Sequence, residues 1–228
     1  ETVASLNENS LAINIHIDGT YSGPGWDHLI AESEKAGIVI LGEQHATADI
    51  PALANQLHET LKSDALAIEV GPWSTRYAVE LIKNGAGTLE TWQARSGHGF
   101  AFPFLFFAEE SKAAEKMALR SPDKIEPLWG LDQEFVGSGA SLLPILQREA
   151  KTDAQKAAVE SFGAAQSKDP MMVGSIDGPA IDSLASAFAG NAIVGEIMTA
   201  LRMTSAIYAP YTRRTGRFYE ANLKRENY

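Results

Sequence analysis

Residues 38–45 of the chain read IVILGEQH. The first four are apolar and three of them are β-branched, which predicts a buried β-strand. In an extended backbone, side chains two positions apart point in the same direction, so Glu43 and His45 would project together from the carboxyl end of this strand. Open α/β sheets bind their ligands at that edge. This stretch therefore predicts both a sheet and the place of its chemistry.

Two further apolar runs, Ala65–Val70 and Pro127–Leu131, have the length and branching of buried parallel strands. Between the first strand and the second, residues 49–61 carry apolar side chains at helical spacing, which completes a βαβ unit with the usual right-handed crossover. A longer insertion separates the second strand from the third. Helices are expected in it near residues 74–83 and 109–119.

The amino-terminal residues 11–17 alternate as an edge strand does, and a helix is expected over residues 26–36. From Gly139 onward, alanine-rich segments with helical periodicity dominate. The predicted fold is therefore α/β, with a mostly parallel central sheet flanked by helices and a largely helical C-terminal half. We expect a single domain over residues 1–228, made of a strand-rich core (1–138) and a helical extension (139–228).

The two ends of the chain carry expectations of their own. Residues 212–228 have helical spacing and end without a terminating glycine or proline, and three strands make a thin sheet. We therefore expect that further strands either follow the helical segment, beyond Tyr228, or are hidden within it. The chain starts at Glu1 without a basic or apolar leader, which is typical of a trimmed secreted protein or of an arbitrary boundary.

Composition narrows the choice of partners. The 19 Lys and Arg against 29 Asp and Glu give a net charge of −10, and no basic run occurs. A nucleic-acid partner is therefore not expected, and a cationic or neutral small molecule fits better.

No apolar stretch reaches the ~18 to 20 residues of a membrane span. The absence of cysteine excludes disulfides, thiolate metal sites and a cysteine nucleophile, and it is compatible with the periplasmic or secreted location that we favour. The oligomeric state is not predicted.

Acidic residues follow each of the three predicted strands, whereas the serine elbow, phosphate-loop and zinc-helix motifs are absent. Glu43, Glu69 and Asp132 would meet with His45 above one sheet edge. Asp132 has a second interpretation, as the cap of the next helix. The helical His58 is interpreted as a surface or packed residue.

Such a cluster permits two kinds of chemistry. A carboxylate beside a neutral imidazole orients it and makes it a stronger base, so His45 would take a proton from water that attacks an ester or a similar carbonyl. Alternatively, Glu43, His45 and Glu69 form an oxygen and nitrogen ligand set suited to Mn, Fe or Zn, and the divalent metal activates the water. The residues leave both alternatives open.

Residues 95–107 hold five of the nine phenylalanines, with two glycines around His98. The functional interpretation is a mobile loop that closes an apolar wall over the site and brings Arg95 and His98 to the ligand. The alternative is a buried segment that anchors the insertion.

Four arginines near the chain end, at positions 213, 214, 217 and 225, recur close to helical spacing. Arg217 is the candidate to reach the acidic cluster or a substrate oxyanion. The alternative is a solvated helix face.

Residues 41–45, followed by a helix and then by residues 67–70, resemble the superfamily that joins erythromycin esterase-like hydrolases, ChaN-type haem-binding proteins and Tiki-type proteases. The strand end at residues 130–132 and the segment 217–222 are similar to the esterase branch. Together these short motifs span most of the chain.

The resemblance implies a parallel α/β core in which Glu43 and His45 are the catalytic acid and histidine and Glu69 is a further acid. Two features depart from the esterase branch. One residue instead of two separates Glu43 from His45, as in ChaN-like members, and no late histidine occurs, because all five histidines lie within the first 98 residues.

Three functions follow from the resemblance. The first is an erythromycin esterase-like hydrolase that acts on an ester, lactone or related carbonyl. The second is a haem- or metal-binding protein without turnover, in which the phenylalanine-rich insertion packs a flat apolar ligand. The third is an inactive member that keeps the fold.

Overall fold

The computed structural model divides the chain into two compact units, residues 1–64 and 65–228, which are described separately. The structure describes residues 10–42, 44–45, 47–85, 89–96, 101–105, 107–120, 126–174 and 176–225. The expectation that all 228 residues form one domain stays a prediction.

In the part of the first unit that the structure describes, two short strands and two helices are present. Its elements are β1 (Asn14–Ile15), β2 (Tyr21–Ser22), α2 (Pro24–Ser33) and α3 (Asp49–Leu61). β1 and β2 pair antiparallel through a turn in which Gly19 has a φ of 81°, a conformation that favours glycine. The predicted helix over residues 49–61 is confirmed, the helix expected at 26–36 lies at 24–33, and the expected edge strand shrinks to the two residues of β1.

The second unit is mostly helical. Its elements are β3 (Leu66–Ile68), α4 (Pro72–Lys83), α5 (Leu89–Ser96), α6 (Ala108–Arg120), β4 (Leu128–Gly130), α7 (Gly139–Glu149), α8 (Asp153–Lys168), the short 3-10 helix η1 (Met172–Gly174), α9 (Gly178–Ala187), α10 (Ala192–Thr212) and α11 (Phe218–Arg225). The helices expected near 74–83 and 109–119 are α4 and α6, and the helical second half is confirmed.

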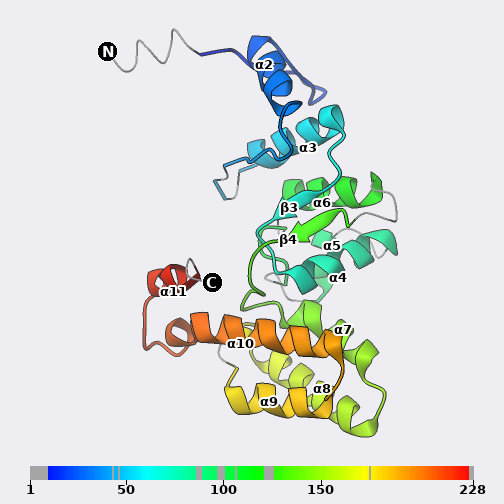
Figure 1. Cartoon of the computed structure of the whole chain (residues 1–228), viewed down its shortest axis with the longest axis vertical. Helices are drawn as coiled ribbons and strands as arrows, with labels where there is room; N and C mark the ends of the chain where they lie inside the picture. The colour runs from blue at the N-terminus through cyan, green and yellow to red at the C-terminus, as the bar shows by residue number, and fades with distance from the viewer. Residues whose placement is uncertain are drawn as a thin grey trace. The chain divides into compact units, whose positions relative to one another are not determined.

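β3 and β4 form a parallel pair, with Leu66 opposite Leu128 and Ile68 opposite Gly130. Two of the three predicted strands are therefore confirmed, each at a length of three residues. Helices α4 and α6 both contact β4 (Figure 1). The residues of this pair alternate in burial, as expected when a sheet has one covered face.

The predicted fold class is wrong. The structure is 61% helix and 5% strand, and within the described residues it has two sheets of two strands each and no extended parallel central sheet. Residues 38–41 form no strand, and Ile38 and Ile40 are 81% and 88% exposed. The reason is that β-branched residues favour a strand only where neighbouring strands and a buried face exist to pair with them. A short apolar run cannot supply either by itself.

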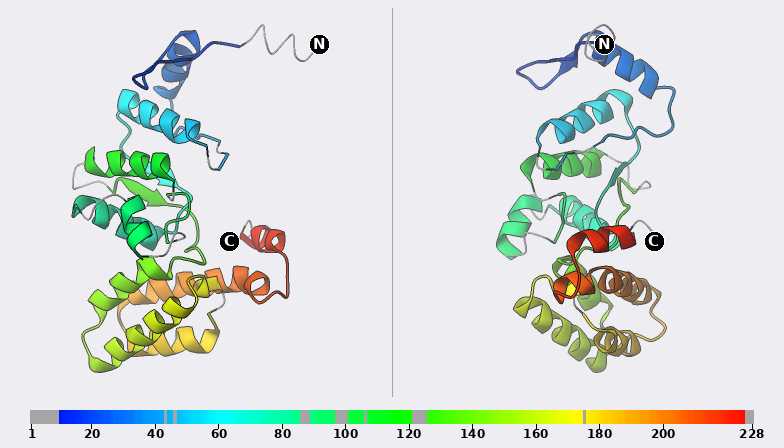
Figure 2. Two further views of the ribbon diagram at one scale, coloured as in Figure 1. Left: turned by 180° about the vertical axis from the view of Figure 1, so that it is seen from behind. Right: turned by 90° about the vertical axis from the view of Figure 1, so that its left-hand side faces the viewer.

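The main hydrophobic core lies in the second unit, where α7, α8, α9 and α10 pack together and α7 contacts α4 (Figures 1 and 2). In α10, Val194, Ile197, Met198 and Leu201 are fully buried. Their spacing of three and four residues places them on one face of the helix. No helix in the described part of the chain is long and apolar enough to cross a membrane.

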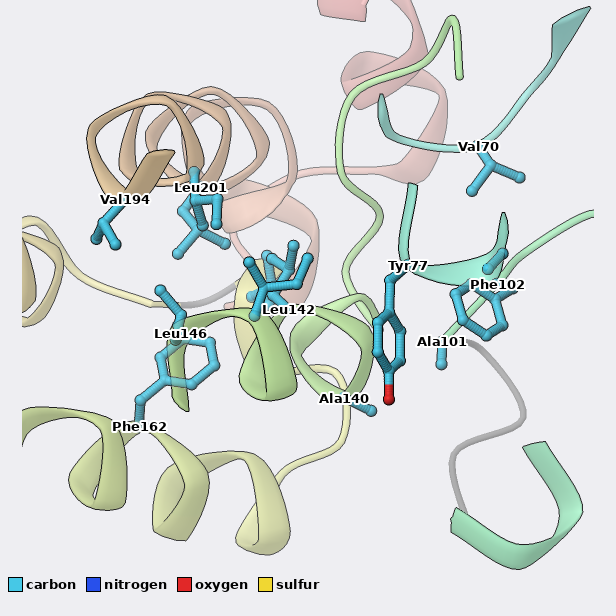
Figure 3. Packing of buried hydrophobic residues seen from close by; sticks show 14 of the residues in the cluster. Val70, Tyr77, Ala101, Phe102, Ala140, Leu142, Leu146, Phe162, Val194 and Leu201 are labelled. Carbon is cyan, nitrogen blue, oxygen red and sulfur yellow. The ribbon is translucent and has the colours of Figure 1, made fainter. Parts of the chain in front are cut away.

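Tyr77 of α4 joins the strand region to the helical group. Figure 3 shows its ring between Ala140 of α7 and Phe102. The ring centroids of Tyr77 and Phe102 are 6.3 Å apart, and that of Trp92 lies 5.0 Å from Phe102. This aromatic cluster makes one continuous core of the β3–β4 region and the helices that follow it.

Candidate functional site

The candidate site is the edge of the sheet at which β3 and β4 end. Beyond the last paired residues, the Leu131 amide donates to the Ile68 carbonyl at 3.0 Å and the Asp132 amide donates to the Val70 carbonyl at 3.3 Å. The parallel pairing therefore continues into the two following loops. It brings Glu69 and Asp132, each partly buried, to the same edge, as the strand order predicts.

Asp132 does not cap the next helix. Its Oδ1 accepts from the amide of the neighbouring Gln133 at 2.8 Å. The next helix, α7, begins after Ser138 without a side-chain cap. The capping alternative for Asp132 is therefore wrong.

Glu134, which the sequence analysis did not single out, is the most buried acid of this edge. It has no exposed surface, and its Oε1 accepts from the amides of Trp73 at 2.7 Å and Ser74 at 3.2 Å. The Ser74 hydroxyl donates to Oε2 at 2.5 Å. Glu134 thus satisfies the first amides of α4, which a helix cannot satisfy from within. The N-cap position of α4 is Gly71, which has no side chain to do so.

The contact between Glu134 and α4 is tight. A Cβ atom on Gly71 would lie 2.4 Å from Cδ of Glu134, so only glycine fits there. On the other side, the Ser74 and Ser141 hydroxyls are 2.8 Å apart, which links the carboxyl to α7. Burial raises the pKa of Glu134, the hydrogen bonds from Ser74 and Trp73 oppose this, and the negative charge of Asp132 adds to the increase.

The loop after β4, residues 131–138, is also fastened to α10. The Thr204 hydroxyl donates to the backbone carbonyl of Glu134, and the Gln133 side-chain amide donates to the Tyr208 hydroxyl at 3.1 Å. Thr204 is fully buried and Tyr208 nearly so. The segment 132–134 is therefore held from three sides, by β3, α4 and α10.

A groove of about 190 Å³ lies along β4. Its lining residues are Pro72, Arg76, Glu126, Leu128, Trp129 and Gly130. The Arg76 guanidinium lies 4.6 Å from the ring centroid of Trp73, and its Nε is 3.2 Å from the Glu126 carboxylate. Ligand pockets usually measure about 300 to 1,000 Å³, so this groove has room for only a small group.

The other predicted site residues are His45, Glu43, His98, Arg95 and Arg217. His45 lies in the first unit and is exposed. Glu43, His98 and the side chain of Arg95 lie outside the described residues. Arg217 is exposed just before α11, and its amide donates to the Glu220 carboxylate at 3.0 Å, which favours the solvated-face alternative.

Residues 101–105 of the phenylalanine-rich insertion form an anchor, whereas Phe107 is 42% exposed. Ala101 and Phe102 have no exposed surface and Leu105 is 2% exposed. The Gln93 side-chain amide and the Ser111 hydroxyl both donate to the Leu105 carbonyl, at 3.0 and 2.7 Å. Residues 101–105 are thus part of the core, as the buried alternative predicts.

No group of three or more histidine and acidic side chains that could hold a metal occurs among the described residues. The predicted set of Glu43, His45 and Glu69 includes a residue outside them, so a divalent metal stays a prediction. Comparisons with protein-family models, with curated proteins and with solved structures find no match to this chain.

Proposed function

We propose that the protein is a hydrolase similar to the erythromycin esterase-like enzymes, acting on an ester, lactone or related carbonyl. The observation that carries the proposal is the parallel pairing of β3 and β4, because it brings Glu69 and Asp132 to one sheet edge, with Asp132 one position further along the pairing than Glu69. Carboxylates at such an edge are typical of ligand and reaction sites in sheets with parallel strands. The role of His45 rests on the resemblance of residues 41–45.

In the proposed reaction, His45 takes a proton from water while the water oxygen attacks the carbonyl carbon. The tetrahedral intermediate then expels the alcohol, which receives the proton from the imidazolium. The resemblance assigns Glu43 and Glu69 the role of orienting the imidazole and tuning its basicity, and Asp132 is the candidate acid for binding the substrate. No covalent intermediate on the protein is needed.

The test is hydrolysis of chromogenic esters and lactones by the wild type and by His45→Gln. The matched control is His28→Gln, because His28 is an exposed histidine of the same unit, on α2. We expect His45→Gln to lower kcat by about 100-fold or more, as is usual when a general base is removed. Hydrolysis by the His45 variant at the wild-type rate would refute the proposal.

A haem- or metal-binding protein without turnover is the alternative, favoured by the single residue between Glu43 and His45. Phe102 is packed against Tyr77 and Trp92, so this ring does not supply an open wall for a flat ligand. A titration with haemin distinguishes the two functions. A saturable Soret shift that a Glu43→Ala/His45→Ala variant loses would favour the alternative.

A further inference from the structure

We infer that Glu134 positions the two candidate acids, Glu69 and Asp132, by fastening the loop after β4 to the loop after β3 and to the first turn of α4. The expected effect of Glu134 on hydrolysis rests on the proposed function, whereas its link between the two loops does not. Glu134 is a positioning residue, because it is fully buried and has no surface for a substrate.

Glu134 is connected to both acids through short stretches of backbone. Asp132 precedes it by two residues, and Glu69 precedes Gly71, which the Glu134 carboxyl touches, by two residues as well. A shift of the Glu134 carboxyl therefore moves both loops together.

The Glu134 carboxyl is held in place by hydrogen bonds to both of its oxygens. A buried carboxyl is costly unless its oxygens are hydrogen-bonded. Both oxygens of Glu134 have partners, which are two amides and one hydroxyl at the start of α4. These partners lie 60 and 61 residues away in the sequence, so the bonds join two separate segments and are more than a local cap.

Other bonds of the loop after β4 join it to different parts of the unit. Thr204 and Tyr208 attach it to α10, and the Asp132 amide is 3.3 Å from the Val70 carbonyl. The Asp132 bond is longer than the usual 2.9 to 3.0 Å and therefore weak. The Leu131 amide and the Ile68 carbonyl, 3.0 Å apart, join the ends of the two strands, whereas the Glu134 carboxyl joins the loop after β4 to the start of α4.

The experiment compares Glu134→Ala and Glu134→Gln with Asp177→Ala. Asp177 is a matched control, because its carboxylate also caps a helix of the same unit, accepting from the Ala180 amide of α9 at 2.8 Å. Amide hydrogen exchange and ester kinetics are measured for each protein at a temperature well below its unfolding transition.

In Glu134→Ala we expect the amides of Leu131 and Asp132 to exchange about tenfold faster or more. Without the Glu134 carboxyl, their hydrogen bonds to the Ile68 and Val70 carbonyls should open together more often. A merely local cap would accelerate only Trp73 and Ser74. We expect kcat/KM for ester hydrolysis to fall about tenfold or more, because a misplaced Glu69 lowers kcat and a misplaced Asp132 raises KM. Glu134→Gln, which keeps the acceptor oxygen, should recover both values to within about threefold of the wild type.

Unchanged exchange at Leu131 and Asp132 in Glu134→Ala would overturn the inference, and so would an equal loss of kcat/KM in Asp177→Ala. A wild-type protein that hydrolyses no ester would refute the proposed function instead. In that case the exchange rates alone would decide whether Glu134 links the two loops. The expected effect of Glu134 on hydrolysis would be refuted together with the proposed function.

Discussion

At the scale of single residues, the acids near β3 and β4 divide by environment. Glu69 and Asp132 are partly exposed at the sheet edge, whereas Glu134 is fully buried two residues further on. The sequence predicts the first two, because each directly follows a parallel strand. It does not predict Glu134, because its partners Trp73 and Ser74 come from a segment about 60 residues away. The only local signal is a helix start at Gly71 and Pro72 without a capping side chain.

The raised pKa of Glu134 predicts how stability depends on pH. The folded protein keeps the proton at pH values where the unfolded chain, with its ordinary pKa of 4.5, has released it. The stabilisation is therefore complete below about pH 4.5 and is lost as the pH rises through the folded-state pKa, at up to about 1.4 kcal/mol per pH unit. Urea unfolding between pH 4 and 8 should show this fall in the wild type and a smaller one in Glu134→Gln. If the free energy of unfolding depended on pH identically in the two proteins, Glu134 would not be the group responsible for the fall.

At the scale of elements, helical spacing in the sequence predicts α3, α4, α6 and the helices after Gly139, because each has enough apolar positions to define one buried face. Strands are harder to predict. Ala65–Val70 and Pro127–Leu131 form β3 and β4 because each is the other's partner, and α4 covers their face. Residues 38–41 are all apolar and yet form no strand, since an apolar composition does not specify a partner strand.

The start of α4 offers a sharp test of this packing. In Gly71→Ala the new methyl group would overlap the Glu134 carboxyl, so we expect a loss of about 1 to 3 kcal/mol in the free energy of unfolding. Gly195→Ala is the control, because a Cβ at this position of α10 meets nothing within 4 Å, and alanine there should leave stability unchanged or raise it by about 0.4 to 1 kcal/mol. Chemical denaturation measures both. Equal stability of Gly71→Ala and the wild type would mean that the Glu134 carboxyl is not seated against residue 71.

At the scale of the whole molecule, every residue of the two buried hydrophobic clusters lies between Val70 and Ala221, inside the second unit. Since burial of apolar surface is the main source of stability, the second unit should hold most of it. The sequence does not reveal this division, because the apolar run at 38–41 looks as suited to a core as the run at 65–70. The structure distinguishes the two runs, because Ile38 and Ile40 are exposed whereas Val70 is buried.

We therefore expect a fragment of residues 65–228 to fold without the first unit. Its near-ultraviolet circular dichroism should match the aromatic signal of Tyr77, Trp92 and Phe102 in the full chain, and its thermal unfolding should be cooperative. A fragment with helical far-ultraviolet signal and no near-ultraviolet signal would show that the core of residues 65–228 requires the first unit.

The central claim is that the edge formed by β3 and β4 is a site of hydrolysis, and the most direct measurement is kcat for a chromogenic ester in Glu69→Gln and Asp132→Asn. Asp153→Asn is the control, because Asp153 is an exposed acid at the start of α8. We predict that Glu69→Gln lowers kcat by about 100-fold, that Asp132→Asn mainly raises KM, and that Asp153→Asn changes neither. Wild-type kcat and KM in both edge variants would contradict the claim.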